Sequence, residues 1–277
     1  FTYGALLNSC EKAWSVALQS LEELPRCRVM PETILCNAAL GVCGKAGWRT
    51  TTMLLVHIHA SSLQRSDVSF NAVLGYFGNL EFGSLWRSGQ ALFHFMRAEG
   101  IQPNLISTNS LMTSFEKNRE WRRAQAFLAD GVDCHGFEED AVTLNALLSA
   151  YEKGYRWAQA QWQLACMVAR QMVSAVTLGA CISAYGVATE WERAVDVHCD
   201  VRSYRIEANS VMCGAALSAC ARGNCWKLAF SLAETETHLG PVELNSALTA
   251  CSSSHVTDRA LMLARQMARR RVQMDLV

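Results

Sequence analysis

One asparagine recurs at the same place in a repeated sequence pattern, among neighbours that suit recognition of a flat, polar ligand. The pattern reads VTLNALLSAYEKGYRW in residues 142–157 and ISTNSLMTSFEKNREW in residues 106–121. We call this asparagine, or its equivalent, the marker. An apolar residue precedes the marker by three positions and a lysine follows it by eight. An amide can hydrogen-bond the edge of a nucleic-acid base, an apolar side chain can pack on the base, and a lysine can meet a phosphate.

The marker recurs every 31 to 38 residues along the chain. Its eight equivalents are Gly4, Asn37, Asn71, Asn109, Asn145, Gly179, Gly214 and Asn245. Such a period is typical of helical-repeat proteins. We therefore expect one array over residues 1–277, with repeats at about 1–32, 33–66, 67–104, 105–140, 141–174, 175–209, 210–240 and 241–275. Both ends cut a repeat, so we expect a piece of a longer array.

Each copy predicts a pair of α-helices. The first helix carries apolar residues at i, i+3, i+4 and i+7, as Leu144, Leu147, Leu148 and Tyr151 do, and only Thr108 interrupts this column. A tryptophan usually opens the second helix: Trp14, Trp48, Trp121, Trp157, Trp191 and Trp226 share this place. One helical pair cannot bury its apolar face alone, whereas stacked pairs can. The sequence therefore predicts an all-α solenoid of about eight helix-turn-helix repeats.

The side of the first helix opposite the core column carries three kinds of residue in line. The apolar place is held by Ile34, Val68, Ile106, Val142, Val176, Val211 and Val242, and by Phe1 in the first copy. The place of the lysine is basic at Lys12, Lys45, Lys117, Lys153 and Arg222. One interpretation is a solvated face whose asparagines cap helices and whose apolar residues pack on the next repeat. The other is a groove lined with amides, apolar wedges and a cationic track.

These residues resemble the pentatricopeptide repeat (PPR) family, in its plain type. The resemblance rests on the opening [VI]-x-x-N-[AS]-x-[LI], on the Glu-Lys pair of EKAW, EKNREW and EKGYRW, and on endings such as MPE (30–32) and QPN (102–104). It covers all eight copies. The nearest rival is the tetratricopeptide family, a protein-binding helical pair. In that family tryptophan belongs to the first helix, whereas here it opens the second.

The resemblance implies a right-handed superhelical solenoid that binds single-stranded RNA, one base per repeat. In the family, the marker and the last residue of the same repeat choose the base, and the apolar residue sandwiches it. The base-reading residues would be Asn37, Asn71, Asn109, Asn145 and Asn245 with Ser66, Asn104, Asp140, Ser174 and Asp275. By family pattern, Asn with Asp favours uracil, Asn with Asn favours cytosine, and Asn with Ser favours pyrimidines. Copies with glycine markers have no side chain to read a base.

Composition and missing motifs exclude several other classes. The formal net charge is +0, which argues against strong non-specific binding to nucleic acid. No apolar run approaches the ~20 residues of a membrane span. Four of the 12 cysteines, which are Cys10, Cys43, Cys220 and Cys251, fill one place of the core column, so we expect buried, reduced thiols. We find no catalytic constellation, no metal-ligand spacing and no cofactor motif, and we expect no enzyme.

Two hypotheses about function remain. The first is an organellar RNA-binding protein, non-catalytic and pyrimidine-preferring, that acts in RNA processing, stability or translation. The alternative is a structural scaffold subunit of a large organellar assembly, a ribosome or a membrane-protein complex, that binds protein or ribosomal RNA without base specificity. A mitochondrial or chloroplast location follows from the family resemblance alone. No DNA partner is expected.

Overall fold

The structure, a computed structural model, describes residues 67–79, 85–135, 139–235, 240–253 and 261–262. These residues belong to the third to eighth predicted repeats. Every regular element among them is a helix, and none is a strand. The all-α class predicted from the sequence periodicity is therefore confirmed over this part of the chain. Residues 1–66, with the first two predicted repeats, lie outside the described residues.

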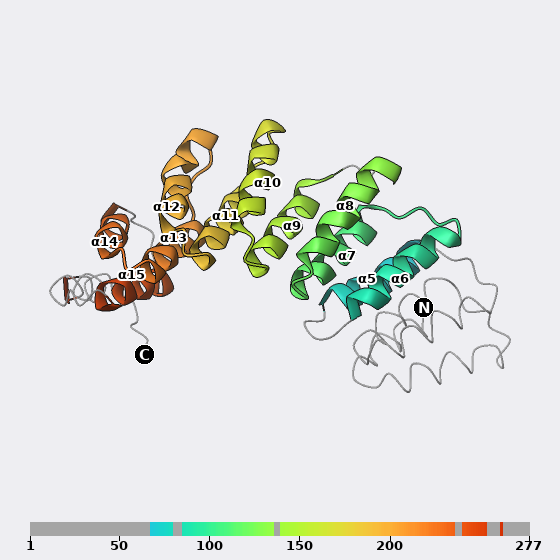
Figure 1. The fold of residues 1–277 in the computed structure, drawn as a ribbon, viewed down its shortest axis with the longest axis horizontal. Coiled ribbons are helices and arrows are strands. Elements are labelled where there is room, and N and C mark those ends of the chain that lie inside the picture. The colour runs from blue at the N-terminus through green and yellow to red at the C-terminus, as the bar shows by residue number, and fades with distance from the viewer. Residues whose placement is uncertain (1–66, 80–84, 136–138, 236–239, 254–260, 263–277) are drawn as a thin grey trace, which may run out of the picture. The chain divides into compact units, whose positions relative to one another are not determined.

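The helices alternate as the repeat pattern predicts (Figure 1). The first helices are α5 (Asp67–Asn79), α7 (Leu105–Lys117), α9 (Ala141–Lys153), α11 (Ala175–Val187), α13 (Ser210–Arg222) and α15 (Pro241–Ser253). The second helices are α6 (Leu85–Ala98), α8 (Trp121–His135), α10 (Trp157–Ala169), α12 (Trp191–Asp200) and α14 (Trp226–Thr235), and the short 3₁₀ helix η1 (Val201–Tyr204) follows α12. Each first helix has 13 residues. This constant length presents equivalent residues in equivalent places.

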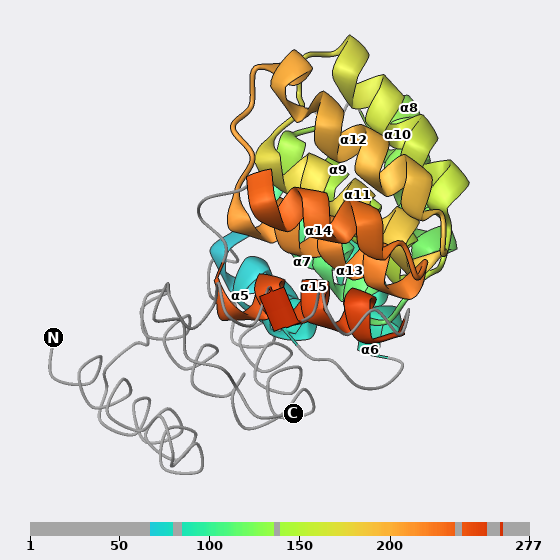
Figure 2. The same ribbon diagram turned by 90° about the vertical axis from the view of Figure 1, so that its left-hand side faces the viewer.

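The chain forms two compact units, Phe1–Thr143 and Leu144–Val277, and the boundary falls inside α9. Within the first unit, α5 packs against α7, and α6 contacts both of them. Within the second unit, α11 packs against α13 and α13 against α15, so these three form one layer (Figures 1 and 2). α12 contacts the first helix on either side of it, and so does α14. A second helix therefore joins two successive repeats.

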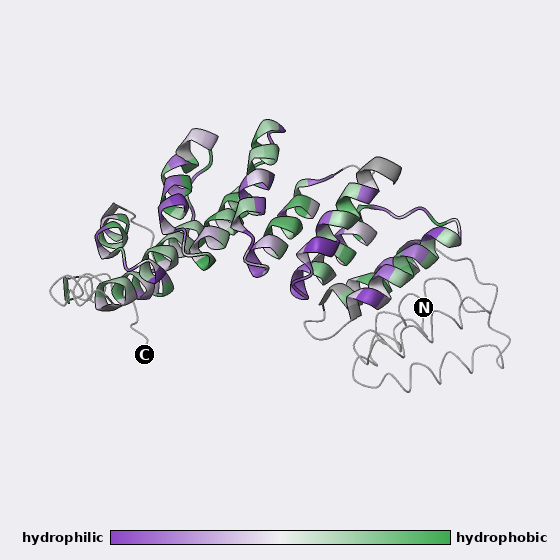
Figure 3. Cartoon of the chain, viewed as in Figure 1, coloured by the Kyte–Doolittle hydropathy of each residue, from purple (hydrophilic) through white to green (hydrophobic). Residues whose placement is uncertain are grey.

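The core is the predicted apolar column. Its members in the described first helices are buried, from Phe70 and Phe77 in α5 to Cys220 in α13 and Cys251 in α15, except Leu248 in α15, which is half-buried. The one polar member, Thr108, is also buried, and its hydroxyl donates to the Asn104 carbonyl oxygen at 3.2 Å. A buried hydroxyl that donates to a backbone carbonyl avoids most of its desolvation cost. Hydrophobic and hydrophilic residues accordingly alternate along the helices (Figure 3).

The tryptophans that begin the second helices tie successive repeats together. The ring of Trp86, which lies in the second place of α6, is 6.0 Å from the Phe115 ring of the next repeat. The ring of Trp157 is 6.4 Å from that of Tyr185. The Arg193 guanidinium stacks on Trp157, 4.4 Å from the centroid of the tryptophan ring. Such ring and cation contacts each contribute on the order of 1 kcal/mol. The tryptophans are therefore packing anchors between neighbouring first and second helices.

A left-handed residue closes the first helix in four described repeats. These residues are Arg119, Tyr155, Thr189 and Asn224, with φ between 54° and 64°. In the fourth repeat the following Glu120 N–H donates to the Phe115 carbonyl oxygen at 3.0 Å, which completes the turn. Side chains with a Cβ are disfavoured in this conformation, most of all when they are β-branched like Thr189. The tight turn keeps the two helices of a repeat close together.

Candidate nucleic-acid interface

Each described first helix carries an exposed apolar side chain in its first turn. Each is the second residue of its helix, and each is 54% to 70% exposed: Val68, Ile106, Val142, Val176, Val211 and Val242. All are branched aliphatic residues, which are normally buried. More than half of the surface of each of the described residues predicted to sandwich a base is therefore open to solvent. They remain available to a ligand, as the groove interpretation requires, while Ile34 lies outside the described residues.

The markers come three residues later, as the fifth residue of each first helix. Asn71, Asn109, Asn145 and Asn245 are all half-buried. The last residue of a repeat immediately precedes the next first helix, where Asn104, Ser174 and Asn209 serve as N-caps. The packing of successive first helices thus brings a marker and a cap into contact. We call the marker and the last residue of the same repeat a reading pair.

The reading pair of the third repeat is joined directly. The Asn71 Nδ2 donates to Asn104 Oδ1 at 3.2 Å, and Asn104 Nδ2 donates to Asp67 Oδ2 at 2.9 Å. Asn104 Oδ1 also accepts from the Ser107 backbone N–H at 3.1 Å, and the Ser107 hydroxyl donates to Asn71 Oδ1 at 2.5 Å. Both amide oxygens are therefore engaged inside the protein. Each amide nitrogen keeps a second N–H that these bonds do not use.

The reading pair of the fourth repeat joins an amide to a carboxylate. Asn109 Nδ2 donates to Asp140 Oδ2 at 3.3 Å, and the Thr143 hydroxyl donates to Asn109 Oδ1 at 2.5 Å. Asp140 Oδ1 accepts from the Thr143 backbone N–H at 2.7 Å, and it also lies within hydrogen-bond distance of the Thr143 hydroxyl, whose single proton is therefore shared between Asp140 Oδ1 and Asn109 Oδ1. Burial acts to raise the pKa of Asp140, but the hydrogen bonds from Thr143 and Asn109 outweigh it and lower that pKa. Asp140 is therefore a carboxylate at neutral pH.

The fifth repeat links its pair through a third side chain. The Thr177 hydroxyl donates to Asn145 Oδ1 at 2.7 Å, and Ser174 Oγ lies 3.0 Å from Thr177 Oγ1. Ser174 Oγ also accepts from the Thr177 backbone N–H at 3.3 Å. Asn145 and Ser174 are thus both hydrogen-bonded to the hydroxyl of Thr177. The serine hydroxyl can donate or accept toward a ligand.

In repeats with a glycine marker, a side chain of the next repeat lies beside the marker. A Cβ added to Gly179 would lie 3.7 Å from Met212 Cγ, and one added to Gly214 would lie 3.3 Å from Glu243 Cγ. In both cases the neighbour is the third residue of the next first helix. The side chains of Met212 and Glu243 therefore lie beside the positions where a marker side chain would begin.

Of the residues predicted to contact phosphate, those that the structure describes lie at the C-terminal ends of first helices. Lys117, Lys153 and Arg222 are the last residues of α7, α9 and α13. Each is eight residues, or about 12 Å along the axis, beyond its marker. A cation in the last turn also stabilises the helix dipole, so this placement fits either a phosphate contact or a helix end. Their role stays a prediction, and Lys12 and Lys45 lie outside the described residues.

Three other predicted base-reading residues also lie outside the described residues. They are Asn37, Ser66 and Asp275. Asn245 is described, but its predicted partner is one of these three.

Sequence reasoning missed one set of residues at the site. Ser107, Thr143 and Thr177 supply the hydroxyls that reach the markers of the preceding repeats. The sequence feature that could have indicated them is the Ser or Thr two positions before the marker in ISTN, VTLN and VTLG. Such residues also suit the first turn of a helix. Only the packing of successive repeats shows that they touch a marker about 34 residues away.

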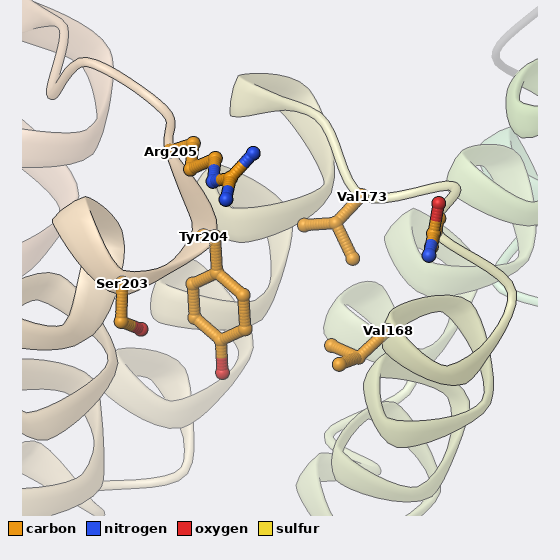
Figure 4. A pocket seen from close by; sticks show the side chains of 6 residues that line it. Val168, Val173, Ser203, Tyr204 and Arg205 are labelled. Carbon is orange, nitrogen blue, oxygen red and sulfur yellow. The ribbon is translucent and has the colours of Figure 1, made fainter.

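The described residues also line an open pocket outside the candidate interface. Six residues at the end of α10 and around η1 line an open pocket of about 460 Å³, in which Tyr204 and Arg205 face Val168 and Val173 (Figure 4). Arg205 is the one charged group of its lining. The described residues contain no group of three or more histidine, cysteine, aspartate or glutamate side chains that could hold a metal ion. The same residues contain no helix long and apolar enough to cross a membrane.

The chain has the fold of solved pentatricopeptide repeat structures, so the predicted all-α helical-repeat fold is confirmed. No family model matches the chain, and no curated protein matches it in sequence. The chain is similar to the solved structure of the pentatricopeptide repeat protein PPR10 in complex with an 18-nt psaJ RNA element, with a TM-score of 0.58 and 17% identity over 98% of this chain. A structure of PPR10 from maize aligns with a TM-score of 0.55 and 16% identity.

This chain spans less than half the length of those solved structures. It covers 45% of the RNA-bound PPR10 chain and 44% of the other. At such low identity the likeness establishes the fold of the chain. The activity of the chain has to be argued from its own side chains.

Proposed function

We propose that this chain binds single-stranded RNA and reads pyrimidines, one base per repeat, through its asparagine markers. The observation that carries the proposal is the pairing of Asn71 with Asn104 and of Asn109 with Asp140, each beside an exposed branched aliphatic residue. An apolar side chain can pack on the face of a base while the pair meets its edge. The likeness to an RNA-bound solved structure supports the same proposal.

The hydrogen bonds inside each pair determine what it offers to a base. In the third repeat both amide oxygens accept bonds from the protein, so the pair offers N–H donors. Cytosine has two adjacent acceptors, O2 and N3, on its Watson–Crick edge. Uracil has an N–H at N3 and would oppose a second donor. The third repeat therefore favours cytosine.

The fourth repeat differs by one group. Asn109 offers an N–H, while the ionised Asp140 offers a carboxylate oxygen as acceptor. Uracil supplies the complement, because its carbonyl oxygens accept and its N3–H donates. In the fifth repeat the Ser174 hydroxyl can serve in either sense, so that repeat accepts both pyrimidines. With the family's parallel orientation, the second to fifth repeats would read pyrimidine, C, U, pyrimidine from 5′ to 3′.

The test is fluorescence anisotropy with labelled 12-mers at low and physiological salt. One carries UCUC, a second carries the same pyrimidines with the central C and U exchanged, and a third is rich in A. We expect tighter binding of the matching order, and a preference that survives the higher salt, because base contacts depend less on salt than phosphate contacts do. Equal binding of all three that vanishes with salt would contradict base reading.

That negative outcome would favour a scaffold role, which the net charge of +0 and the glycine markers motivate. The measurement for it is the mass of the particle with which the protein co-purifies from an organelle extract. We further propose a mitochondrial or chloroplast setting and a non-catalytic role in RNA processing, stability or translation. Imaging of the full-length protein fused to a fluorescent protein tests the location.

A further inference from the structure

Each asparagine marker in the third to fifth repeats accepts a hydrogen bond from the next repeat. The donors are Ser107, Thr143 and Thr177, and their oxygens lie 2.5 to 2.7 Å from the marker's Oδ1. Each donor is the third residue of the next first helix, and each is buried. We call the residue at this place the bridging residue.

The bridging hydroxyl and the last residue of the repeat together set which end of the amide meets the ligand. An asparagine amide can turn over and exchange its oxygen and nitrogen at little steric cost, and a hydroxyl can donate to the oxygen or accept from the NH₂ group. In the fourth repeat the carboxylate of Asp140 only accepts, and it accepts from Asn109 Nδ2 at 3.3 Å. That leaves Oδ1 facing the Thr143 hydroxyl, which can donate to it. The hydroxyl then holds Oδ1 inward while the N–H groups face the last residue and the ligand.

Along the whole sequence, the type of the marker goes with the type of the bridging residue in the next repeat. Asparagine markers are followed by a bridging hydroxyl and glycine markers by a larger side chain without one. The seven successive pairs are Gly4 with Leu35, Asn37 with Ser69, Asn71 with Ser107, Asn109 with Thr143, Asn145 with Thr177, Gly179 with Met212, and Gly214 with Glu243. All seven follow the rule, although helix starts in general tolerate many residue types.

Packing explains the glycine side of this rule. Met212 and Glu243 reach within 3.7 Å and 3.3 Å of a Cβ built on Gly179 and Gly214. A marker side chain there would meet a thioether or carboxylate-bearing chain and no hydroxyl donor. A carboxylate next to an amide would also favour the opposite amide orientation, because it accepts from N–H groups.

We infer that the bridging residue is a specificity-positioning residue for the repeat before it, and that Ser or Thr there, together with the last residue of that repeat, holds an asparagine marker as an N–H donor. This inference rests on the proposed RNA binding. A repeat reads a base only when marker and bridging residue match. Repeats six and seven are silent for two reasons, because their glycines carry no amide and their bridging residues could not orient one.

The first experiment replaces Thr143 with valine, which keeps the shape of the side chain and removes the hydroxyl. Two 12-mers that differ only in having U or C opposite the fourth repeat are compared by anisotropy. We expect the preference for U to fall about tenfold in Thr143→Val. Thr143→Ser should retain it. Thr113→Val is the matched control, because the Thr113 hydroxyl donates to the Asn109 backbone carbonyl and does not touch the amide.

A second measurement needs no RNA. The unfolding equilibria of Asn109→Ala, Thr143→Val and the double variant form a double-mutant cycle. The hydrogen bond predicts coupling of about threefold or more in the unfolding equilibrium constant. Additive effects would overturn the contact itself.

The outcomes separate the inference from the proposed function. If the wild-type chain prefers U and Thr143→Val keeps that preference, the inference fails and base reading stands. If Thr143→Val weakens binding of U and C equally, the residue is merely structural and the inference fails again. If the wild-type chain shows no preference between the bases, the proposed function fails, and with it the positioning role.

A gain of function completes the test. Gly179→Asn with Met212→Thr builds the missing pair next to Asn209, the last residue of the sixth repeat. We expect the double variant to gain about tenfold selectivity for C at one further base. Gly179→Asn alone should gain at most a small part of it. Equal gains by the single and double variants would show that the bridging residue is dispensable.

Discussion

The third to fifth repeats and the sixth to seventh repeats share one scaffold but differ at its exposed face. Both groups bury the same core column, begin each first helix with an exposed branched residue and have first helices of 13 residues. They differ at the marker, where three asparagines give way to Gly179 and Gly214. The core therefore constrains the fold, whereas recognition is decided by single side chains that the core does not use.

The largest expected effect tests the shared part of the comparison. Leu148 in α9 and Leu217 in α13 hold the same place in the core column, and both are buried. We expect Leu148→Ala and Leu217→Ala to cost about 2–5 kcal/mol of unfolding free energy each, by loss of apolar burial and by leaving a cavity. Chemical denaturation measures both. A loss of unfolding free energy in only one of the two variants would mean that the core column is not equivalent in the two groups of repeats.

The next effect tests the difference between the regions. Asn109→Ala with Asn145→Ala removes two reading amides, and we expect affinity for a pyrimidine 12-mer to fall about a hundredfold, at 1–3 kcal/mol per base contact. Gly179→Ala is the control, because its new Cβ would only make an ordinary contact with Met212. It should leave affinity within about twofold. Circular dichroism checks that the double variant stays folded.

A single-atom exchange sharpens the comparison between two reading repeats. Asp140→Asn turns the fourth pair into a copy of Asn71 with Asn104, while an asparagine can still cap α9. We expect its preferred base to change from U to C, by about tenfold in relative affinity. Asn104→Asp combined with Asp67→Asn, which avoids two carboxylates at the 2.9 Å contact between these side chains, should change the third repeat from C to U. Anisotropy with single-base variants of one oligonucleotide measures both, and an unchanged preference would contradict the donor-acceptor argument.

The smallest effect concerns the turn that both regions use. Thr189 closes α11 with a φ of 64°, and its side chain is exposed. Thr189→Gly should raise the unfolding free energy by about 1 kcal/mol, because glycine adopts this conformation without strain. Thermal unfolding measures the gain. Thr113→Gly, a change inside α7, should lower stability instead, and a loss at both sites would mean that the turn stores no strain.

Much of the fold could be predicted because the repeat pattern is redundant. Each copy predicts the same apolar column, so Thr108 could be recognised as an exception within a regular series. Four tryptophans predict the starts of α8, α10, α12 and α14 to the residue. The left-handed turns at Arg119 and Tyr155 could not be predicted, since their sequences differ and neither residue is glycine.

The candidate site could be predicted only as columns of residues. The residues from Val68 to Val242 were expected either to face a ligand or to pack on the next repeat, and their exposure of 54% to 70% is what the first possibility needs. The alignment of marker and last residue came from the family resemblance. Their hydrogen bonds come from the structure, because they depend on how closely two first helices approach.

The sequence by itself determined the period, the helical pairs and the identity of the markers, because each is written locally and many times over. The tertiary structure decided which of these residues meet. It brings Asn109, Asp140 and Thr143 together from two successive first helices, and it places the Thr143 hydroxyl against the amide of Asn109, 34 residues away. Sequence spacing cannot show such a contact, because the direction of a hydrogen bond is fixed only when the helices carrying its partners pack side by side.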